Sequence, residues 1–175
     1  MDERQLIEGC VQGKSWAQKA MYESYAPAMM SVCKRYVRCQ DTAQDLLHDG
    51  FVKLFTKIHT YSYAGSFKGW MKKIFVTTAL EHIRRNDALR NSIDAEIFEY
   101  QNIESDVSIF EQLSVNELFA CIAYLPDAYR IIFNMHAIEG YSHVEIAKEL
   151  GINENTVRSR YAKARQMLQE MVNES

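Results

Sequence analysis

The chain has 175 residues, 47% of them hydrophobic, which is enough to form the core of one domain or of two small ones. It holds 20 Lys and Arg against 23 Asp and Glu, and this net charge of −3 argues at first against a nucleic-acid-binding protein. No apolar run approaches the roughly 18 residues of a membrane span, and the acidic N-terminus does not resemble a secretory signal. We therefore expect a cytoplasmic protein without direct membrane insertion.

The charges are distributed unevenly along the chain. Residues 1–90 carry a balance of +5, residues 91–129 contain no Lys or Arg and carry −8, and residues 130–175 are neutral. Basic residues gather again within the first and last of these segments, between 68 and 90 and between 158 and 165. This asymmetry predicts two modules with basic faces and a connecting segment that repels phosphate.

Apolar residues recur at helical spacing in three segments of the first half, 28–38, 43–58 and 70–85. Asp41 is expected to cap the second of these helices. Residues 59–69 break the period with aromatic residues, serines and glycines, which predicts a loop. Residues 86–112 have no strong period and contain many acids, so they are interpreted as a linker.

Helical spacing returns over residues 115–125. Pro126 suits the first turn of the next helix, which Gly140 should end. Because no segment shows a sustained period of two, the predicted fold class is all-α. We expect two small helical domains, residues 1–90 and 113–175, joined by an acidic linker over 91–112.

Residues 142–166 carry the features of a helix-turn-helix. Ser142 and Glu145 form a capping-box pattern, Gly151 suits a tight turn, and Asn153 is a good cap for the second helix. The outer face of that second helix would present side chains able to contact base edges or phosphates. These candidates are Asn155, Thr156, Arg158, Ser159, Lys163 and Arg165.

A series of motifs precedes this helix-turn-helix. In chain order they are KRYV at 34–37, DTAQDLLHDGFVKLF at 41–55, SFKGWMKKI at 66–74, HIRR at 82–85 and LPDAYRIIF at 125–133. Together they resemble the extracytoplasmic-function (ECF) group of bacterial RNA polymerase sigma factors, and the resemblance covers most of the chain. It implies a factor that directs core polymerase to specific promoters and initiates transcription.

The resemblance also implies a role for each motif. The helix over 41–55 would bind the coiled-coil clamp of the largest polymerase subunit through Asp45, Leu46, Leu47 and Asp49, the two leucines lying at or beneath the interface. The loop and helix that follow would hold the promoter's minus-ten element as a melted strand, by stacking on bases and by following phosphates. The residues proposed for that strand are Tyr61, Tyr63, Ser66, Phe67, Lys68, Lys72, Lys73, Thr77, Arg84 and Arg85. Trp70 is expected to be a core anchor beneath the loop.

The remaining expectations concern partners. The second helix of the helix-turn-helix would read the minus-thirty-five element in duplex DNA, and the linker would thread the polymerase cleft. The resemblance further implies an anti-sigma factor that holds the two domains shut. No cofactor and no metal site is expected.

Other chemistries find little support. The stretch from Gly9 to Ser15 is one residue short of a phosphate-binding loop and no strand precedes it, and His143 with Glu145 lacks the Cys pair of a zinc deaminase. An enzyme is therefore not expected. Two alternatives stay open: a helix-turn-helix regulator that binds duplex DNA alone, with a helical sensor domain in front, and a helical adaptor that binds only proteins.

Overall fold

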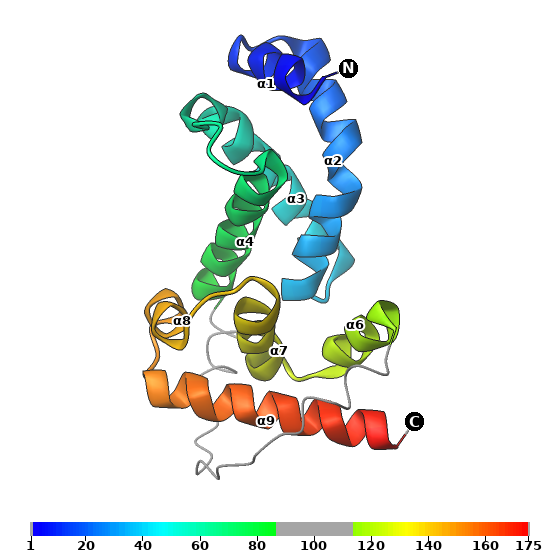
Figure 1. Ribbon diagram of the computed structural model, residues 1–175, viewed down its shortest axis with the longest axis vertical. Coiled ribbons are helices and arrows are strands. Elements are labelled where there is room, and N and C mark those ends of the chain that lie inside the picture. The colour runs from blue at the N-terminus through cyan, green and yellow to red at the C-terminus, as the bar shows by residue number, and fades with distance from the viewer. Residues whose placement is uncertain (1, 87–113, 175) are drawn as a thin grey trace. The chain divides into compact units, whose positions relative to one another are not determined.

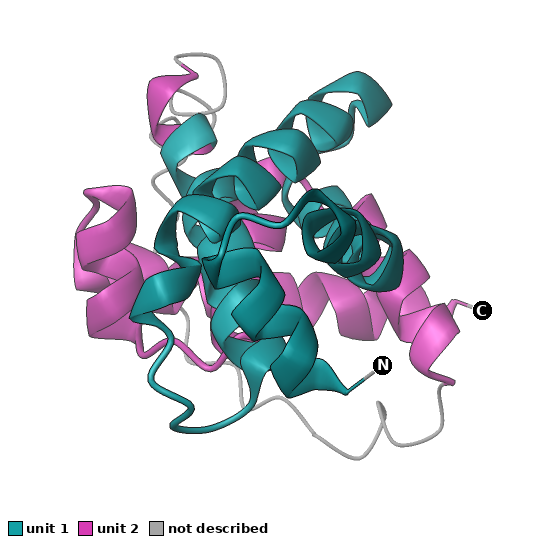
Figure 2. Cartoon of the chain, turned by 90° about the horizontal axis from the view of Figure 1, so that it is seen from above, with its two compact units in different colours: residues 1–82 teal, residues 83–175 magenta. Residues whose placement is uncertain are grey.

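The computed structural model describes residues 2–86 and 114–174, and within those ranges every regular element is a helix (Figure 1). The chain divides into two compact units, residues 1–82 and 83–175 (Figure 2). The all-α prediction is confirmed. The predicted linker over 91–112 and the predicted domain ends at 90 and 113 lie outside the described residues.

Among the described residues, the first unit is built from four α-helices and one short 3₁₀ turn, and the last three residues of its fourth helix, 83–85, belong to the second unit. These elements are α1 (Glu3–Val11), α2 (Ser15–Tyr36), α3 (Gln40–Lys57), η1 (Ile58–Thr60) and α4 (Phe67–Arg85). Helix α1 and the first half of α2 were not predicted. Helix α1 buries only a few residues, among them Leu6 and Ile7, and α2 continues through Pro27, so neither shows a long apolar stripe.

Two glycines of the first unit allow helices to approach closely. A Cβ atom on Gly9 would lie 2.7 Å from the Cβ of Ala17, and one on Gly50 would lie 2.3 Å from the Cε1 of Phe75. Gly13, with φ of 69°, makes the turn between α1 and α2. The glycines that give residues 9–15 their likeness to a phosphate loop therefore serve helix packing and a turn.

Two helix starts of this unit differ from the prediction. Cys39, not Asp41, is the N-cap of α3, and Asp41 lies in the first turn, where a carboxylate favours the positive end of the helix dipole. Helix α4 begins at Phe67 rather than at residue 70. Ser66 starts it early, because its hydroxyl oxygen accepts a hydrogen bond from the Gly69 N–H at 3.3 Å.

Over residues 114–174, the second unit forms four α-helices and one π-helical turn. These elements are α6 (Val115–Tyr124), α7 (Asp127–Phe133), η3 (Asn134–Ile138), α8 (His143–Leu150) and α9 (Glu154–Asn173). Pro126 is the N-cap of α7. The helix expected to run up to Gly140 is α7 followed by the π turn η3, and Gly140 ends it with φ of 80°.

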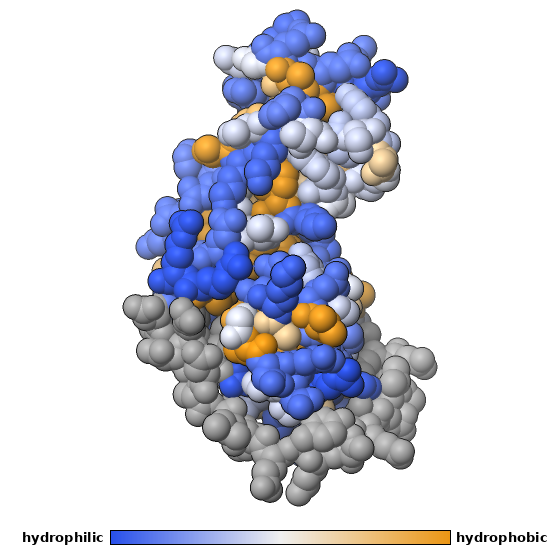
Figure 3. Space-filling model, turned by 90° about the vertical axis from the view of Figure 1, so that its left-hand side faces the viewer, coloured by the Kyte–Doolittle hydropathy of each residue, from blue (hydrophilic) through white to orange (hydrophobic). Residues whose placement is uncertain are grey.

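The core of the second unit joins α6 and α7 to the C-terminal half of α9. Its buried members are Ile122, Leu125, Tyr129, Phe133, Ala164 and Leu168. Helix α9 also packs against α8. The face of the molecule drawn in Figure 3 is mostly hydrophilic, with apolar residues in small separate patches, as expected when apolar side chains fill the interior.

Candidate nucleic-acid interfaces

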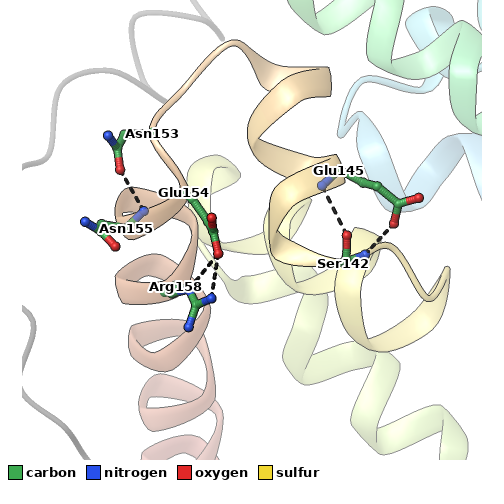
Figure 4. A network of polar contacts seen from close by, with 6 residues as sticks. All are labelled: Ser142, Glu145, Asn153, Glu154, Asn155 and Arg158. Atoms are coloured by element: carbon green, nitrogen blue, oxygen red, sulfur yellow. Dashed lines mark hydrogen bonds and ion pairs between the residues drawn. The ribbon is translucent and has the colours of Figure 1, made fainter.

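The first helix of the helix-turn-helix begins with the expected capping box (Figure 4). The Ser142 N–H donates to Glu145 Oε2 at 2.8 Å, and the Glu145 N–H donates to Ser142 Oγ at 3.2 Å. Two amides that a helix start leaves without a partner are thereby satisfied. The capping-box prediction is confirmed.

The turn and the start of α9 also follow from local chemistry. Gly151 ends α8 in the left-handed conformation, with φ of 68°, and the Ile152 N–H donates to the Ala147 carbonyl at 3.1 Å. Asn153 caps α9, because its Oδ1 accepts from the Asn155 N–H at 2.8 Å. Both predictions are confirmed. The hydrogen bonds that form the turn and the cap all join residues within six positions of each other.

Helix α9 turns one face inward and leaves another for a ligand. Helix α8 packs against α9, and Val157 of α9 is buried, as are Ile146 and Leu150 of α8. On the opposite side the helical repeat sets out two lines of polar side chains. Asn155, Ser159 and Lys163 form the first line, Arg158 and Arg165 form the second, and Thr156 flanks the first.

Arg158 is 56% exposed and already engaged on its own helix (Figure 4). Its Nε donates to Glu154 Oε1 at 3.0 Å and its terminal nitrogen donates to the same oxygen at 2.5 Å. An exposed ion pair one turn apart is worth only about 0.3–0.5 kcal/mol. A DNA phosphate or a guanine edge can therefore compete with Glu154 for the guanidinium. In the absence of DNA, Glu154 holds the Arg158 side chain in place.

The two cations further along α9 are partly exposed. The Lys163 ammonium donates to Gln166 Oε1 at 3.3 Å, and the Arg165 guanidinium lies 5.9 Å from the centre of the Tyr161 ring. Both side chains are half-buried, and their contact with DNA stays a prediction. Arg160, which precedes both of them in sequence, is instead buried, so the local cluster of basic residues is divided between surface and interior.

Two histidines to which the sequence analysis gave no role, His136 and His143, pack against Tyr161 of α9. The rings of His136 and His143 are 4.3 Å apart, and Tyr161 contacts both. The Tyr141 carbonyl lies 2.7 Å from His136 Nδ1. Burial, then the neighbouring His136 and Arg158, lower the pKa of His143, and Glu154 opposes them. The neutral form of His143 is thus favoured in the folded unit.

In the first unit the loop between η1 and α4 is held by aromatic rings. Phe67 is 1% exposed, and its ring contacts those of Tyr25, Tyr61 and Trp70 at centroid distances of 5.9, 5.1 and 5.8 Å. Tyr61 is 8% exposed, and its hydroxyl donates to the Gly65 carbonyl at 2.7 Å. Trp70 is partly buried against both rings, in keeping with its predicted anchoring role.

These contacts correct the part predicted for Tyr61 and Phe67. A ring that stacks on an unpaired base needs an open face, and neither ring has one here. Both support the loop from beneath. Tyr63, in contrast, is 51% exposed and has a positive φ of 58°, the single such non-glycine position among the described residues. It offers the open aromatic surface of this loop.

Polar candidates of α4 fall on different sides of the helix. Lys68 and Lys72 are one turn apart, whereas Lys73, Thr77 and Arg84 follow a second line. The Thr77 hydroxyl donates to the Lys73 carbonyl at 2.8 Å, so its oxygen can accept a further bond. Arg85 is exposed at the end of the helix, away from both lines.

The acidic motif of α3 has the predicted two-layered form. Asp45 and Asp49 are exposed one turn apart, while Leu46 and Leu47 are buried and thus lie beneath the surface rather than on it. Further along, Lys53 pairs with Glu81 of α4. An acidic turn of this kind suits a basic helical partner.

Two features are absent from the described residues. No helix within 2–86 and 114–174 is long and apolar enough to cross a membrane. The same part of the chain holds no group of three or more His, Cys, Asp or Glu side chains that could bind a metal ion.

Comparison with known families gives two matches that follow the division of the chain. Residues 21–89 match Sigma-70 region 2, and residues 116–168 match Sigma-70, region 4. The two matches together span more than half of the chain. The first contains α3, the aromatic loop and α4, and the second contains the helix-turn-helix.

Two sigma factors are similar to most of this chain, and one solved structure has a similar fold. The chain is 28% identical to the ECF RNA polymerase sigma factor SigE of Mycolicibacterium smegmatis over 89% of its length, which spans 61% of that relative. It is 27% identical to the ECF RNA polymerase sigma-E factor of Escherichia coli K12 over 95% of its length and 92% of that protein. Among solved structures, CnrH in complex with the cytosolic domain of CnrY superimposes with a TM-score of 0.51 at 18% identity, over 99% of this chain and 98% of that one.

Proposed function

The chain belongs to the ECF group of bacterial RNA polymerase sigma factors, which direct core polymerase to specific promoters and initiate transcription, and we propose how its two units divide this task. The second unit reads duplex DNA at the minus-thirty-five element. The first unit binds core polymerase and holds the minus-ten element as a melted strand. The protein itself makes and breaks no covalent bond.

The observation that carries this division is the contrast between the two candidate surfaces. Helix α9 is a rigid rod with a polar outer face, whose Asn155, Arg158 and Lys163 suit the edges and phosphates of a duplex groove. The loop before α4 instead presents an exposed tyrosine, Tyr63, and α4 itself carries lysines, a combination that suits unpaired bases and a single phosphate chain.

The acidic turn of α3 is the proposed contact with core polymerase. Asp45 and Asp49 would pair with basic side chains of the coiled-coil clamp of the largest subunit, and the buried Leu46 and Leu47 would keep the turn rigid. The partner is taken from the family, and the exposure of both carboxylates supports it.

Two further parts of the proposal rest on the family alone. An anti-sigma factor would cover these surfaces until it is released; in the solved structure of CnrH, that protein is bound to the cytosolic domain of CnrY. The protein would act in the cytoplasm, where its polymerase and promoters are. No cofactor is needed for either binding step.

Reconstitution tests the proposal directly. Purified chain added to core polymerase should support initiation from promoters selected out of a genomic DNA library, and the chain alone should bind duplex DNA weakly. If the chain alone protects duplex DNA while the mixture never initiates, it is a stand-alone regulator. If neither activity is found, it is a protein-binding adaptor.

The polymerase contact has its own test in Asp45→Arg. We expect a clear loss of affinity for core polymerase in a titration, because the new cation would face a basic partner, with an unchanged circular dichroism spectrum. Gln44→Arg on the neighbouring exposed position is the matched control for an added charge. Equal affinity of Asp45→Arg and the unchanged protein would remove Asp45 from the interface.

The duplex contact is tested by Arg158→Ala in the holoenzyme. A base contact should cost about 1–3 kcal/mol of promoter affinity and relax the preference at one position of the minus-thirty-five element. Selection from a randomised upstream element measures both. An equal loss on every sequence would show that Arg158 contacts phosphate only.

A further inference from the structure

Helix α1 lies outside every region to which the sequence assigned a role, yet it reaches the aromatic loop. The guanidinium carbon of Arg4 lies 5.6 Å from the centre of the Tyr63 ring. This is the distance of a cation–π contact. It joins the start of the chain to the one open ring of the loop.

The start of α1 is fixed relative to that loop by a second contact. The Tyr25 hydroxyl of α2 donates to Glu3 Oε2 at 2.7 Å, and the Tyr25 ring packs edge-on against Phe67, the buried support of the loop. Burial, together with the Glu3 carboxylate, raises the pKa of Tyr25 to about 12, so this hydroxyl keeps its proton at neutral pH. Leu6 and Ile7 then bury the inner side of α1.

The Arg4 guanidinium can bind a second acceptor in addition to Glu8. Its Nε donates to Glu8 Oε1 at 3.1 Å, and its side chain remains 74% exposed. Guanidinium carries several N–H donors in a plane, so one bond to Glu8 leaves others for a second acceptor. The exposed pair with Glu8 is too weak to prevent a phosphate from sharing this cation.

Arg4 thus holds a cation over the exposed aromatic ring of Tyr63. A nucleotide of a single strand offers a flat base next to an anionic phosphate. The positive φ of Tyr63 turns the residue out of the regular chain direction, and the Tyr61 ring, 5.0 Å away, limits its movement.

We propose, on the premise that this loop binds the melted strand, that Arg4 extends the strand-binding surface onto α1. Tyr63 stacks on an unpaired base, and Arg4, held over the same ring, binds the phosphate next to that base. Helix α1 is then part of the DNA-binding surface and not only a support of the first unit.

Four variants in reconstituted holoenzyme separate these roles, with fluorescent oligo(dT) as the probe because stacking tolerates any base. Arg4→Gln removes the charge and keeps a planar group, and Arg4→Lys keeps the charge. Lys19→Gln is the matched control, because Lys19 is an exposed cation of α2 in a comparable ion pair with Glu23. Tyr63→Ala removes the ring, and core polymerase alone provides the background.

We expect Tyr63→Ala to weaken oligo(dT) binding about fivefold or more and Arg4→Gln to weaken it about three- to tenfold. Arg4→Gln should also reduce the slope of log affinity against log salt concentration by about 0.7, the value for one phosphate of a single strand. Arg4→Lys should restore that slope, and Lys19→Gln should change neither quantity.

The outcomes distinguish this inference from its premise. If Tyr63→Ala binds as tightly as the unchanged protein, the assignment of the melted strand to this loop fails, and the inference fails with it. If Tyr63→Ala binds weakly but Arg4→Gln matches Lys19→Gln in affinity and in slope, the premise stands and Arg4 has no contact with DNA.

Discussion

The two candidate DNA surfaces are built in opposite ways. The helix-turn-helix of the second unit is set by bonds between near neighbours: the box of Ser142 and Glu145, the left-handed Gly151 and the Asn153 cap. The aromatic loop of the first unit is set by contacts between residues far apart in the chain, since Phe67 meets Tyr25 and Tyr63 meets Arg4. A surface that binds a rigid duplex can be formed by one local motif. A surface that binds a flexible single strand is here formed by residues of three helices and a loop.

This difference predicts where mutations act. Removing a local hydrogen bond should lower the unfolding free energy by about the contribution of that one bond and leave the rest of the unit folded. Removing a long-range support should weaken the unit as a whole. The two tryptophans, Trp16 and Trp70, both lie in the first unit, so fluorescence reports on that unit while far-ultraviolet circular dichroism reports on both.

The largest effect is expected for Phe67→Ala. Removing a fully buried phenylalanine ring should lower the unfolding free energy of the first unit by about 3–5 kcal/mol, because a cavity replaces its contacts with three aromatic neighbours. Urea unfolding followed by tryptophan fluorescence measures this loss.

Phe67→Leu refines the same test, since it fills most of the space without an aromatic face. If Phe67 is a support, this variant should keep most of its affinity for a single strand, and Tyr63→Leu should lose far more. The reverse order would restore Phe67 as a stacking residue.

A smaller effect is expected for Ser142→Ala, which removes one half of the capping box. The loss should be about 1 kcal/mol, seen as a lower midpoint of the second unit in circular dichroism. Ser114→Ala is the matched control, because Ser114 and Glu117 form an equivalent capping box at the start of α6. Comparable losses for the two variants are expected if the bonds are local, and a loss for Ser142→Ala several times larger would mean that long-range contacts also hold α8.

The smallest effect is a dependence of the second unit on pH. The pKa of His143 is lowered in the folded unit by burial, His136 and Arg158, against the opposing Glu154, and Tyr161 also faces the ring. Below the ordinary histidine pKa of about 6.5, the unfolded chain takes up this proton more readily than the folded one. Stability is therefore complete above that pH and is lost as the pH falls through the unfolded and then the folded pKa.

Thermal unfolding at a series of pH values between about 5 and 8 measures this dependence. His143→Gln should flatten the curve of the second unit, and His59→Gln, at an exposed position of the first unit, should not. We expect a small slope because His143 is only partly buried. An unchanged slope in His143→Gln would assign the titration to another group.

The sequence alone determined most of the second unit. Capping boxes, turn glycines and the apolar stripe of α9 are signals that span a few residues, and each depends on backbone geometry that is the same in any protein. The same kind of signal identified the exposed acidic turn of α3. It did not identify α1 or the start of α2, where short or interrupted apolar patterns give little local evidence.

Only the tertiary structure decided which aromatic residues face the solvent. In the sequence Tyr61, Tyr63 and Phe67 are equivalent, because an aromatic residue in a glycine-rich loop is as suited to a core as to a base. Packing of α2 and α4 takes Phe67 and Tyr61 inward and leaves Tyr63 open. Likewise the sequence places Arg4 in no motif, and α1 brings it over Tyr63 only because Leu6 and Ile7 must be buried. Burial of a side chain depends on which distant segments pack against it, and a local sequence pattern does not contain this information.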